Sequence, residues 1–370
     1  MNVKYAYFDR EYDKLENLLI PKIKEVLRGG AFILRSEVEA FERRIAEKLG
    51  VKFCIGVNSG TDALILGLIA CDFDKGSEII LPAHSFASSA FAILHAGLVP
   101  KFVDVGSDHN ILVDKIQDKI TSKTRAIMCV HMNGTPCQMD EICSIAKQND
   151  LTVLEDAAQS FGARFQDSFC GSFGRFAAFS MHPLKNLNVA GDGGFLTTNS
   201  ESLAKDVAAL RNIGQEKKGV HSLLGYNSRL DNIQAAIANI KLDHFDFVVN
   251  QRSKIAKVYF DELQDLNLEF ACKTTFTDTA IASSYSNFVV VADNRDKLRS
   301  DLADAGVETL IAWDPPIYQS KFINGGVSRG YPNTKKLASQ SLNLPINQFM
   351  SHAEVEEVIF QVKKSIKKIE

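Results

Sequence analysis

Short apolar runs alternate with helical stretches over much of the chain, and this alternation restricts the folds that the sequence can adopt. Each run has the length of a buried strand. Strands that are separated by helices pair in parallel, and the helices then cover both faces of the sheet. The pattern therefore predicts an α/β fold with a mainly parallel sheet. Its strands are expected at residues 51–57, 78–82, 99–103, 126–130, 151–154, 177–180 and 194–198.

Helices are expected before and between these strands. Residues 15–27 carry apolar side chains at helical spacing, although Pro21 can delay the start of this helix. Ser36 and the acidic residues after it predict a second helix with a serine cap, which ends at Gly50. Further helices are predicted at 62–70, from Phe86, at 139–148 and at 230–244.

The character of the sequence changes near residue 246. A helix is predicted at 252–266, a strand at 286–292 and a helix at 295–305. Ser351 and Glu354 have the spacing of a capping box ahead of a final helix at 355–369. We therefore expect a large domain over residues 1–245, including the N-terminal helical segment, and a smaller C-terminal α/β domain over residues 246–370.

The composition favours small-molecule chemistry. The net charge is −3 with both signs interspersed, so we expect neither a nucleic-acid nor a membrane partner. The N-terminus has no apolar segment of signal-peptide length, which leads us to expect a cytoplasmic protein. The seven cysteines contain no C-x-x-C pair, so we expect reduced core residues without a disulfide framework or a metal site.

Three polar features stand at the ends of predicted strands. Asn58-Ser-Gly-Thr-Asp62 lies where a strand turns into a helix, so it is either a phosphate site or a plain capped turn. No Walker loop or G-x-G-x-x-G fingerprint occurs, which disfavours ATP and NAD. Glu155 and Asp156 end another strand, and only one of them can face a given site. Asp156 is either that carboxylate or the cap of a following helix.

The third feature is Lys185, which is set in a turn between an apolar strand and the glycine cluster Gly191–Gly194. Such a lysine is either a reactive amine or one more surface charge. Together, a phosphate turn, a carboxylate at a strand end and a lysine in a buried turn are what a pyridoxal 5'-phosphate (PLP) site needs. The lysine forms an imine with the aldehyde, and the carboxylate keeps the pyridine nitrogen protonated.

The order of these segments resembles the DegT/DnrJ/StrS family of PLP-dependent sugar aminotransferases. The similarity extends from near residue 15 to the final helix. It implies the aspartate-aminotransferase-like architecture (fold type I), with a mainly parallel seven-stranded-type sheet. The matching runs are 58–64 (NSGTDAL), 153–163 (VLEDAAQSFGA), 179–187 (FSMHPLKNL), 191–194 (GDGG) and 225–236 (GYNSRLDNIQAA).

The resemblance also implies roles for single residues. Lys185 falls on the imine-forming catalytic lysine, Asp156 on the partner of the pyridine nitrogen, and Gln159 on the residue near the ring oxygen. Phe86 falls on the aromatic that stacks against the ring, although core packing is the alternative for any one phenylalanine. Four further residues fall on phosphate-contacting positions: Ser59, Gly60, Thr61 and Ser180.

Asn227 matches a residue that reaches the phosphate from the neighbouring subunit, so the resemblance implies a homodimer with shared active sites. It also implies that glutamate donates the amino group, that pyridoxamine phosphate is the intermediate, and that a nucleotide-linked ketosugar accepts the amine. Two alternatives remain. One is a PLP-dependent nucleotide-sugar dehydratase, although that branch replaces the lysine by histidine. The other is a cofactor-binding regulatory homologue, although no DNA-binding module is appended.

The chain departs from the family pattern near the expected substrate. Arg35 stands where a glycine is common, and Asn133 replaces the usual aromatic before Gly134. Trp313 either lines the sugar site or packs in a loop, and His182 is interpreted as structural, with a substrate contact as the alternative. The basic residues that are candidates for a diphosphate are Arg211, Lys217, Lys218 and Arg229.

Overall fold

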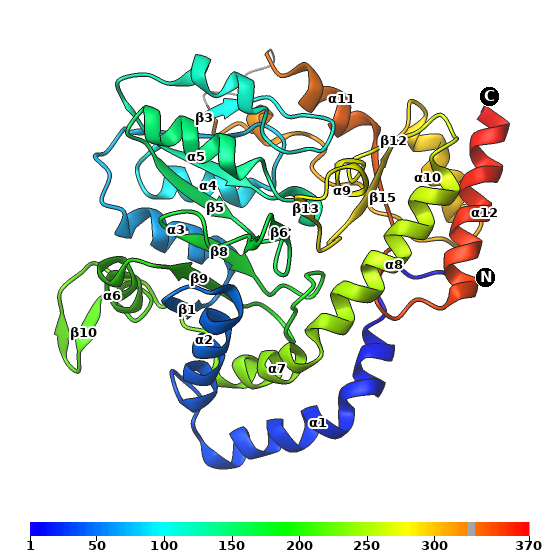
Figure 1. The fold of residues 1–370 in the computed structure, drawn as a ribbon. Helices are drawn as coiled ribbons and strands as arrows, with labels where there is room; N and C mark the ends of the chain where they lie inside the picture. Colours follow the sequence, from blue (N-terminus) through cyan, green and yellow to red (C-terminus); the bar gives the residue numbers. More distant parts are fainter. Residues whose placement is uncertain (324–329, 370) are drawn as a thin grey trace.

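The computed structural model describes residues 1–323 and 330–369, and its centre is a sheet of seven strands in the order β1-β9-β8-β5-β4-β2-β3 (Figure 1). The strands β3, β2, β4, β5 and β8 are parallel, while β9 is antiparallel to both of its neighbours. The expected mainly parallel sheet is therefore confirmed. Its strands are β1 Phe53–Val57, β2 Glu78–Pro82, β3 Val99–Val103, β4 Thr124–Val130, β5 Thr152–Asp156, β8 Ala177–Ser180 and β9 Gly194–Thr198.

Helices cover both faces of this sheet because alternate strand residues point to opposite sides. Met128 and Leu154 pack in one core with α3, α4 and α6, while Ile127 and Cys129 pack in another with α5. A third core joins α2 and α7 to β1, β8 and β9. Among the described residues, no helix has both the length and the apolar character that crossing a membrane requires. These helices are α2 Ser36–Leu49, α3 Gly60–Ala70, α4 Ala87–His95, α5 Met139–Gln148, α6 Glu201–Leu210 and α7 Asn232–Asp243.

The first helix, α1 Phe8–Gly29, corrects the expectation that Pro21 delays its start, because the helix continues through the proline. Leu15 and Leu19, before the proline, are buried against Ile237 of α7, and Ile23, after it, packs against the same cluster, so contacts hold the helix on both sides of the proline. Ser36 does not cap α2 either. Its N-cap is Arg35, and the Oδ1 atom of Asn232 accepts the N–H groups of residues 37 and 38.

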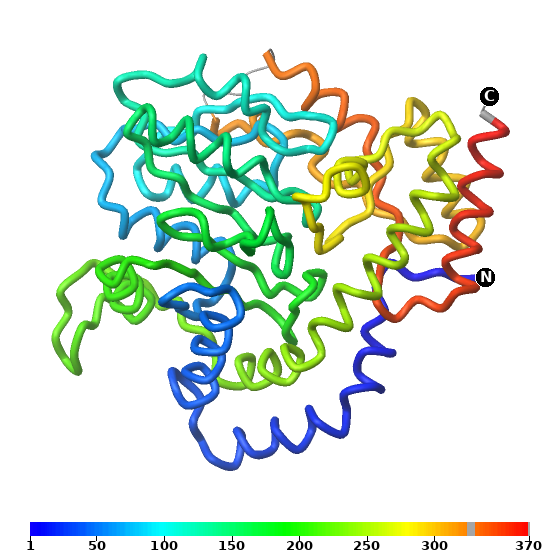
Figure 2. Tube along the Cα trace, in the orientation of Figure 1, coloured from blue at the N-terminus to red at the C-terminus, as the bar shows by residue number. Residues whose placement is uncertain are grey.

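A smaller lobe is built from the C-terminal part of the chain and lies beside the large sheet in Figure 2. Helix α8 connects the two, since Phe245 packs in a large-domain core and Tyr259 in the core of the small lobe. Val3 also belongs to the small-lobe core. The division near residue 246 stays a prediction. The elements are α8 Phe245–Leu263, β12 Glu269–Phe270, α9 Thr274–Thr277, β13 Ile281–Ala282, β14 Phe288–Val291, α10 Arg295–Asp304, α11 Pro332–Gln340, β15 Ser341–Leu344 and α12 His352–Ile369.

Short elements complete the fold. The order β12-β14-β15 forms the sheet of the small lobe, and β13 instead pairs with β6 beside the large domain. The hairpin β10–β11 projects from the body of the molecule (Figure 1). The bounds are β6 Arg164–Phe165, β7 Ser168–Phe169, β10 Gln215–Lys217, β11 Val220–His221, and the 3₁₀ helices Val113–Lys115, Gln117–Lys119, Met132–Gly134 and Ile317–Gln319.

The predicted capping box is confirmed at the start of α12, and it also ties the two ends of the chain together. The N–H of Ser351 donates to Glu354 at 2.7 Å, and the N–H of Glu354 donates to Ser351 Oγ at 3.3 Å. Arg10 donates to both carboxylate oxygens of Glu354, at 2.7 and 2.8 Å, and Tyr7 donates at 2.8 Å. Burial alone would raise the pKa of Glu354. The hydrogen bonds outweigh this effect and lower the pKa to about 2.

Glu354→Gln keeps the size of this side chain and removes its charge. We expect the free energy of unfolding to fall by about 2 kcal/mol at neutral pH, because hydrogen bonds to a charged group are lost. Folding lowers the pKa from 4.5 to about 2, so the ionised form stabilises the protein above pH 4.5 and this stabilisation is lost as the pH falls towards 2. The difference in Tm between wild type and E354Q should therefore shrink in acid. The exposed Glu356→Gln is the control, and an equal loss there would contradict the assignment.

Candidate active site

A pocket of about 680 Å³ opens where the parallel strands β4, β5 and β8 end. This is the edge at which such sheets present their binding crevice. The C-terminal part of the chain contributes Asn287 and Trp313 to the lining of this pocket. The structure thus brings together predicted site residues from distant parts of the sequence. Those that line the pocket are Ser59, Gly60, Thr61, Phe86, Asp156, Gln159, Ser180 and Lys185.

The predicted phosphate turn lies at the N-terminus of α3. Ser59 is the N-cap, and its Oγ accepts the N–H of Asp62 at 3.0 Å. A Cβ atom on Gly60 would lie 2.8 Å from Cβ of Ser180, and one on Gly194 would lie 2.3 Å from the carbonyl carbon of Ser59. Glycine at these two positions therefore lets the helix start pack directly against β8 and β9. The main-chain N–H groups and the nearby hydroxyls form a place suited to a phosphate dianion.

Asp156 faces this pocket, whereas Glu155 points to the opposite face of β5, as the strand alternation predicts. The Oδ2 atom of Asp156 accepts a hydrogen bond from the hydroxyl of Ser89 at 2.7 Å, and its Oδ1 atom accepts one from the N–H of Ala158 at 3.2 Å. The alternative that Asp156 caps a helix is wrong, because the next element of regular structure is β6. Burial raises the pKa of Asp156, while the Ser89 hydrogen bond and the Lys185 charge oppose this shift. A buried carboxylate of this kind favours a cationic partner.

Lys185 occupies the predicted turn, and its N–H donates to the carbonyl of His182 at 2.8 Å. The side chain is partly exposed and lines the pocket. Desolvation of the amine lowers the pKa of Lys185, and the Asp156 carboxylate partly counteracts that shift. A larger fraction of this amine is therefore neutral near pH 7 than of an ordinary surface lysine. Neutrality is what an amine needs to act as a nucleophile or a base.

Gln159 is fixed by amide contacts from two parts of the chain. Its Oε1 accepts the N–H of Asn133 at 2.9 Å and the Nδ2–H of Asn287 at 3.2 Å. Asn133 is buried with a φ of 60°, and Asn287 also donates to its Oδ1 at 3.2 Å. The residue that departs from the family pattern is thus part of the support for Gln159. Tyr5 extends this network by donating to Asn287 Oδ1 at 3.2 Å.

Ser89 and Asn287 were missed by the sequence reasoning. Ser89 lies on α4, four residues after Ser85, with which it shares a hydrogen bond of 2.7 Å, so two hydroxyls at this spacing across the start of a predicted helix were a usable signal. Asn287 had no local signal, because its partner Gln159 lies more than a hundred residues away in the chain.

The remaining candidates lie at the rim of the pocket or outside it. Phe86 lines the pocket and is 59% exposed, and Trp313 also lines it while packing edge-on to His84. Asn227 is exposed and does not line the pocket of its own chain. Arg211 pairs with Glu42 and donates to the carbonyl of Gly56, so its guanidinium is engaged in the fold. The other basic candidates also lie outside the pocket lining, namely Lys217, Lys218 and Arg229.

Known proteins resemble this chain over nearly its whole length. The family model described as "DegT/DnrJ/EryC1/StrS aminotransferase family" matches residues 13–363. A dTDP-3-amino-3,6-dideoxy-alpha-D-galactopyranose transaminase from Aneurinibacillus thermoaerophilus is 39% identical over 92% of this chain and 93% of its own. The erythromycin biosynthesis sensory transduction protein EryC1 from Saccharopolyspora erythraea is 35% identical over 98% of this chain and 99% of its own.

The fold agrees with these matches. The solved structure of S. venezuelae DesV in complex with a ketimine intermediate has a TM-score of 0.96 and 32% sequence identity, with 100% of both chains covered. The fold class implied by the resemblance is therefore confirmed. The chain belongs to the DegT/DnrJ/EryC1/StrS aminotransferase family.

Proposed function

We propose that this protein is a PLP-dependent aminotransferase that moves an amino group from glutamate to a nucleotide-linked ketosugar. The observation that carries the proposal is one pocket that holds the Lys185 amine, the Asp156 carboxylate and the N-terminus of α3. The transaminase from Aneurinibacillus thermoaerophilus supports the substrate class, because its name specifies a dTDP-linked amino sugar. A pocket of about 680 Å³ also has room for more than the cofactor.

The residues present fit PLP. Asp156 would hold the pyridine nitrogen, Gln159 the ring oxygen, and Phe86 the face of the ring. When bound, PLP supplies the electron-accepting ring that transamination needs. The phosphate would be held by the group formed of Ser59, Gly60, Thr61 and Ser180.

Lys185 and Asp156 have different roles in the proposed reaction. The neutral Nζ of Lys185 would take the proton from the substrate carbon that bears the amino group and would deliver it to the cofactor carbon that receives this amino group. The desolvation that lowers its pKa favours this neutral state. Asp156 would keep the proton on the ring nitrogen of the cofactor, and the Ser89 hydroxyl orients the carboxylate by donating to it. Asp156 is only 5% exposed, and this burial limits the access of water to its carboxylate.

A regulatory role is the second candidate, because the relative from Saccharopolyspora erythraea is named a sensory transduction protein. Glutamate-dependent amination of the bound cofactor, without turnover of any ketosugar in a panel, would favour it. A dehydratase has less support, since the residue at the site is Lys185 and not histidine. Release of ammonia instead of an aminated product would favour that reaction.

We further propose a homodimer in which Asn227 reaches the pocket of the neighbouring subunit. Asn227 is exposed beside an apolar surface, the hairpin surface, that a monomer would leave in water. Leu224 is 95% exposed, and its neighbours are also uncovered in the single chain. The hairpin surface consists of Ile213, Val220, Leu223, Leu224 and Tyr226.

Lys185→Ala is expected to lower transamination by about 10³-fold or more, because both a nucleophile and a base are removed. Borohydride reduction of the PLP-loaded wild type should attach the cofactor to the Lys185 peptide, as read by peptide mass spectrometry. The control is Lys205→Ala, an exposed lysine of α6 that pairs with Glu201. Attachment of PLP to another lysine would overturn the assignment.

Asp156→Asn keeps the shape of the side chain and removes its charge. We expect kcat to fall by about 10²- to 10³-fold, because a charge that stabilises the reacting ring is lost. Ser89→Ala should lower kcat by a smaller factor than Asp156→Asn, since it removes one hydrogen bond and leaves the carboxylate in place. Steady-state kinetics with glutamate test both variants, and an active D156N enzyme would exclude the proposed role.

Mixing two variants tests the shared site. Lys185→Ala and Asn227→Ala subunits should each be poorly active alone, the second through weak PLP binding. In a mixed dimer, one pocket combines an intact Lys185 with an intact Asn227 from the other subunit. Random exchange should therefore restore about a quarter of the wild-type activity. If mixing restores nothing, or if Asn227→Ala alone is fully active at limiting PLP, the shared pocket is wrong.

A further inference from the structure

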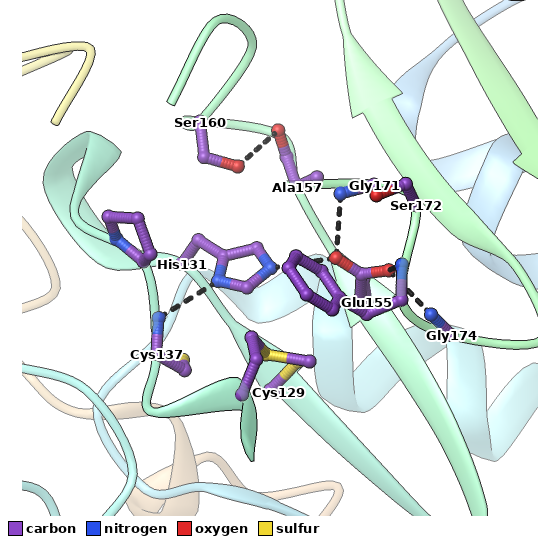
Figure 3. Close-up of polar contacts among 12 residues, drawn as sticks. Cys129, His131, Cys137, Glu155, Ala157, Ser160, Gly171, Ser172 and Gly174 are labelled. Carbon is purple, nitrogen blue, oxygen red and sulfur yellow. Dashed lines mark hydrogen bonds and ion pairs between the residues drawn. The ribbon is translucent and has the colours of Figure 1, made fainter. Parts of the chain in front are cut away.

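Behind Asp156, on the opposite face of β5, Glu155 is fully buried and accepts four hydrogen bonds (Figure 3). The main-chain N–H of Gly171 donates to Oε2 at 2.6 Å, and those of Phe173 and Gly174 donate to Oε1 at 2.9 and 2.7 Å. The fourth contact is His131 Nε2, which lies 3.0 Å from Oε2. Four donors match the acceptor capacity of an ionised carboxylate. Glu155 is therefore a fully buried carboxyl group whose hydrogen bonds come from the main chain and one imidazole.

His131 is held in one orientation by its other nitrogen. The N–H of Cys137 donates to Nδ1 at 3.1 Å, so Nε2 carries the ring proton and donates it to Glu155 (Figure 3). Ligand atoms of Cys129, His131 and Cys137 lie within 4.8 Å of one another, which is the spacing of a metal cluster. Their thiols, however, donate to the carbonyls of Leu154 and Val130, at 3.4 and 3.2 Å. These hydrogen bonds hold the three side chains around Glu155.

Glu155, on β5, joins the end of β4 to the turn that leads into β8. The main-chain N–H of His131 donates to the carbonyl of Asp156 at 3.2 Å, so the end of β4 is tied to both acidic residues of β5. The turn from Gly171 to Gly174 leads into β8, which is followed by Lys185. Strands β5 and β8 have only two residue pairs in register, compared with five between β4 and β5. The three main-chain bonds to Glu155 reinforce this short pairing.

Resting on the proposed function, we propose that Glu155, held by His131, is a positioning residue that fixes Asp156 relative to Lys185. It touches neither the pocket nor the reacting atoms. It acts through the register of β5 against the segment that enters β8. We expect a large loss of rate when this positioning is lost, because a displacement of about 1 Å between groups that must act together lowers the rate about 10²-fold.

Variants of His131 test this role without placing a new group against the main-chain donors of the turn. His131→Leu removes the donor to Glu155 at similar volume, whereas His131→Gln retains an N–H donor. Cys129→Ala is the matched control, because it opens the same buried cluster and leaves every bond to Glu155 intact. Each variant is compared at a temperature where it is folded, with Tm measured on the PLP-free protein.

We expect His131→Leu to lower kcat by about tenfold or more with little change in the KM for glutamate, because the transition state and not ground-state binding is affected. The rate at which PLP attaches to Lys185 in the PLP-free protein should fall as well. His131→Gln should recover most of both rates. Cys129→Ala should keep both, even where its Tm falls as much as that of His131→Leu.

Two results would overturn the positioning role. The first is a His131→Leu variant that keeps the wild-type kcat and the wild-type rate of PLP attachment. The second is a Cys129→Ala variant that loses as much of both rates as His131→Leu does when the two have the same Tm. Wild-type turnover of a ketosugar, measured first, tests the proposed function by itself. A failure of that function is thus distinguished from a failure of the positioning role, which shows only in the attachment rates and in the comparison among variants.

Discussion

The contact between the start of α3 and the ends of β8 and β9 is the constraint on which the pocket depends. Neither Gly60 nor Gly194 has room for a Cβ atom, so the main chain of the helix start lies as close to these strands as packing allows. Lys185 follows β8 in the chain and lines the same pocket as the N-terminus of α3. An antiparallel β9 within a mainly parallel sheet makes this contact possible, because it brings Gly194 back to the same edge.

Burial then acts in opposite directions on the two charged groups of the pocket. It raises the pKa of Asp156 and lowers the pKa of Lys185, since in both cases the ionised form loses solvation. The same environment therefore favours a neutral amine and leaves the carboxylate in need of a cationic partner. The proposed reaction needs both a neutral amine and a carboxylate that would pair with a protonated ring nitrogen, and burial in one pocket favours both.

Features set by local sequence could be predicted, and features set by distant contacts could not. The strands, the turn at Lys185 and the Ser351 capping box each depend on residues within a few positions of one another. The cap of α2 comes instead from Asn232, almost two hundred residues away, so Ser36 was a misleading local signal. Helix α1 continued through Pro21 for a related reason, because packing on α7 outweighs a local propensity.

The candidate site divides in the same way. Three site residues end or follow predicted strands, namely Ser59, Asp156 and Lys185. Their positions in the sequence therefore predict that they lie at one edge of the sheet. The residues that orient them are contributed by other elements. Ser89 lies on a neighbouring helix and Asn287 in the C-terminal part, and only the folded chain brings them to Asp156 and Gln159.

The turn from Gly171 to Gly174 meets Glu155 through main-chain N–H groups alone. Every residue except proline offers such a donor, so the contact specifies the length of the turn and not its side chains. Its two glycines are restricted by space, because a Cβ atom would lie 2.3 Å from the Phe179 ring at Gly171 and 2.8 Å from the Val153 carbonyl oxygen at Gly174. The side chain of Ser172, between them, donates to the carbonyl of Phe169 at 2.7 Å and not to Glu155. An inserted or deleted residue in this turn would therefore displace the donors from Glu155, whereas a substitution at Ser172 would leave them in place.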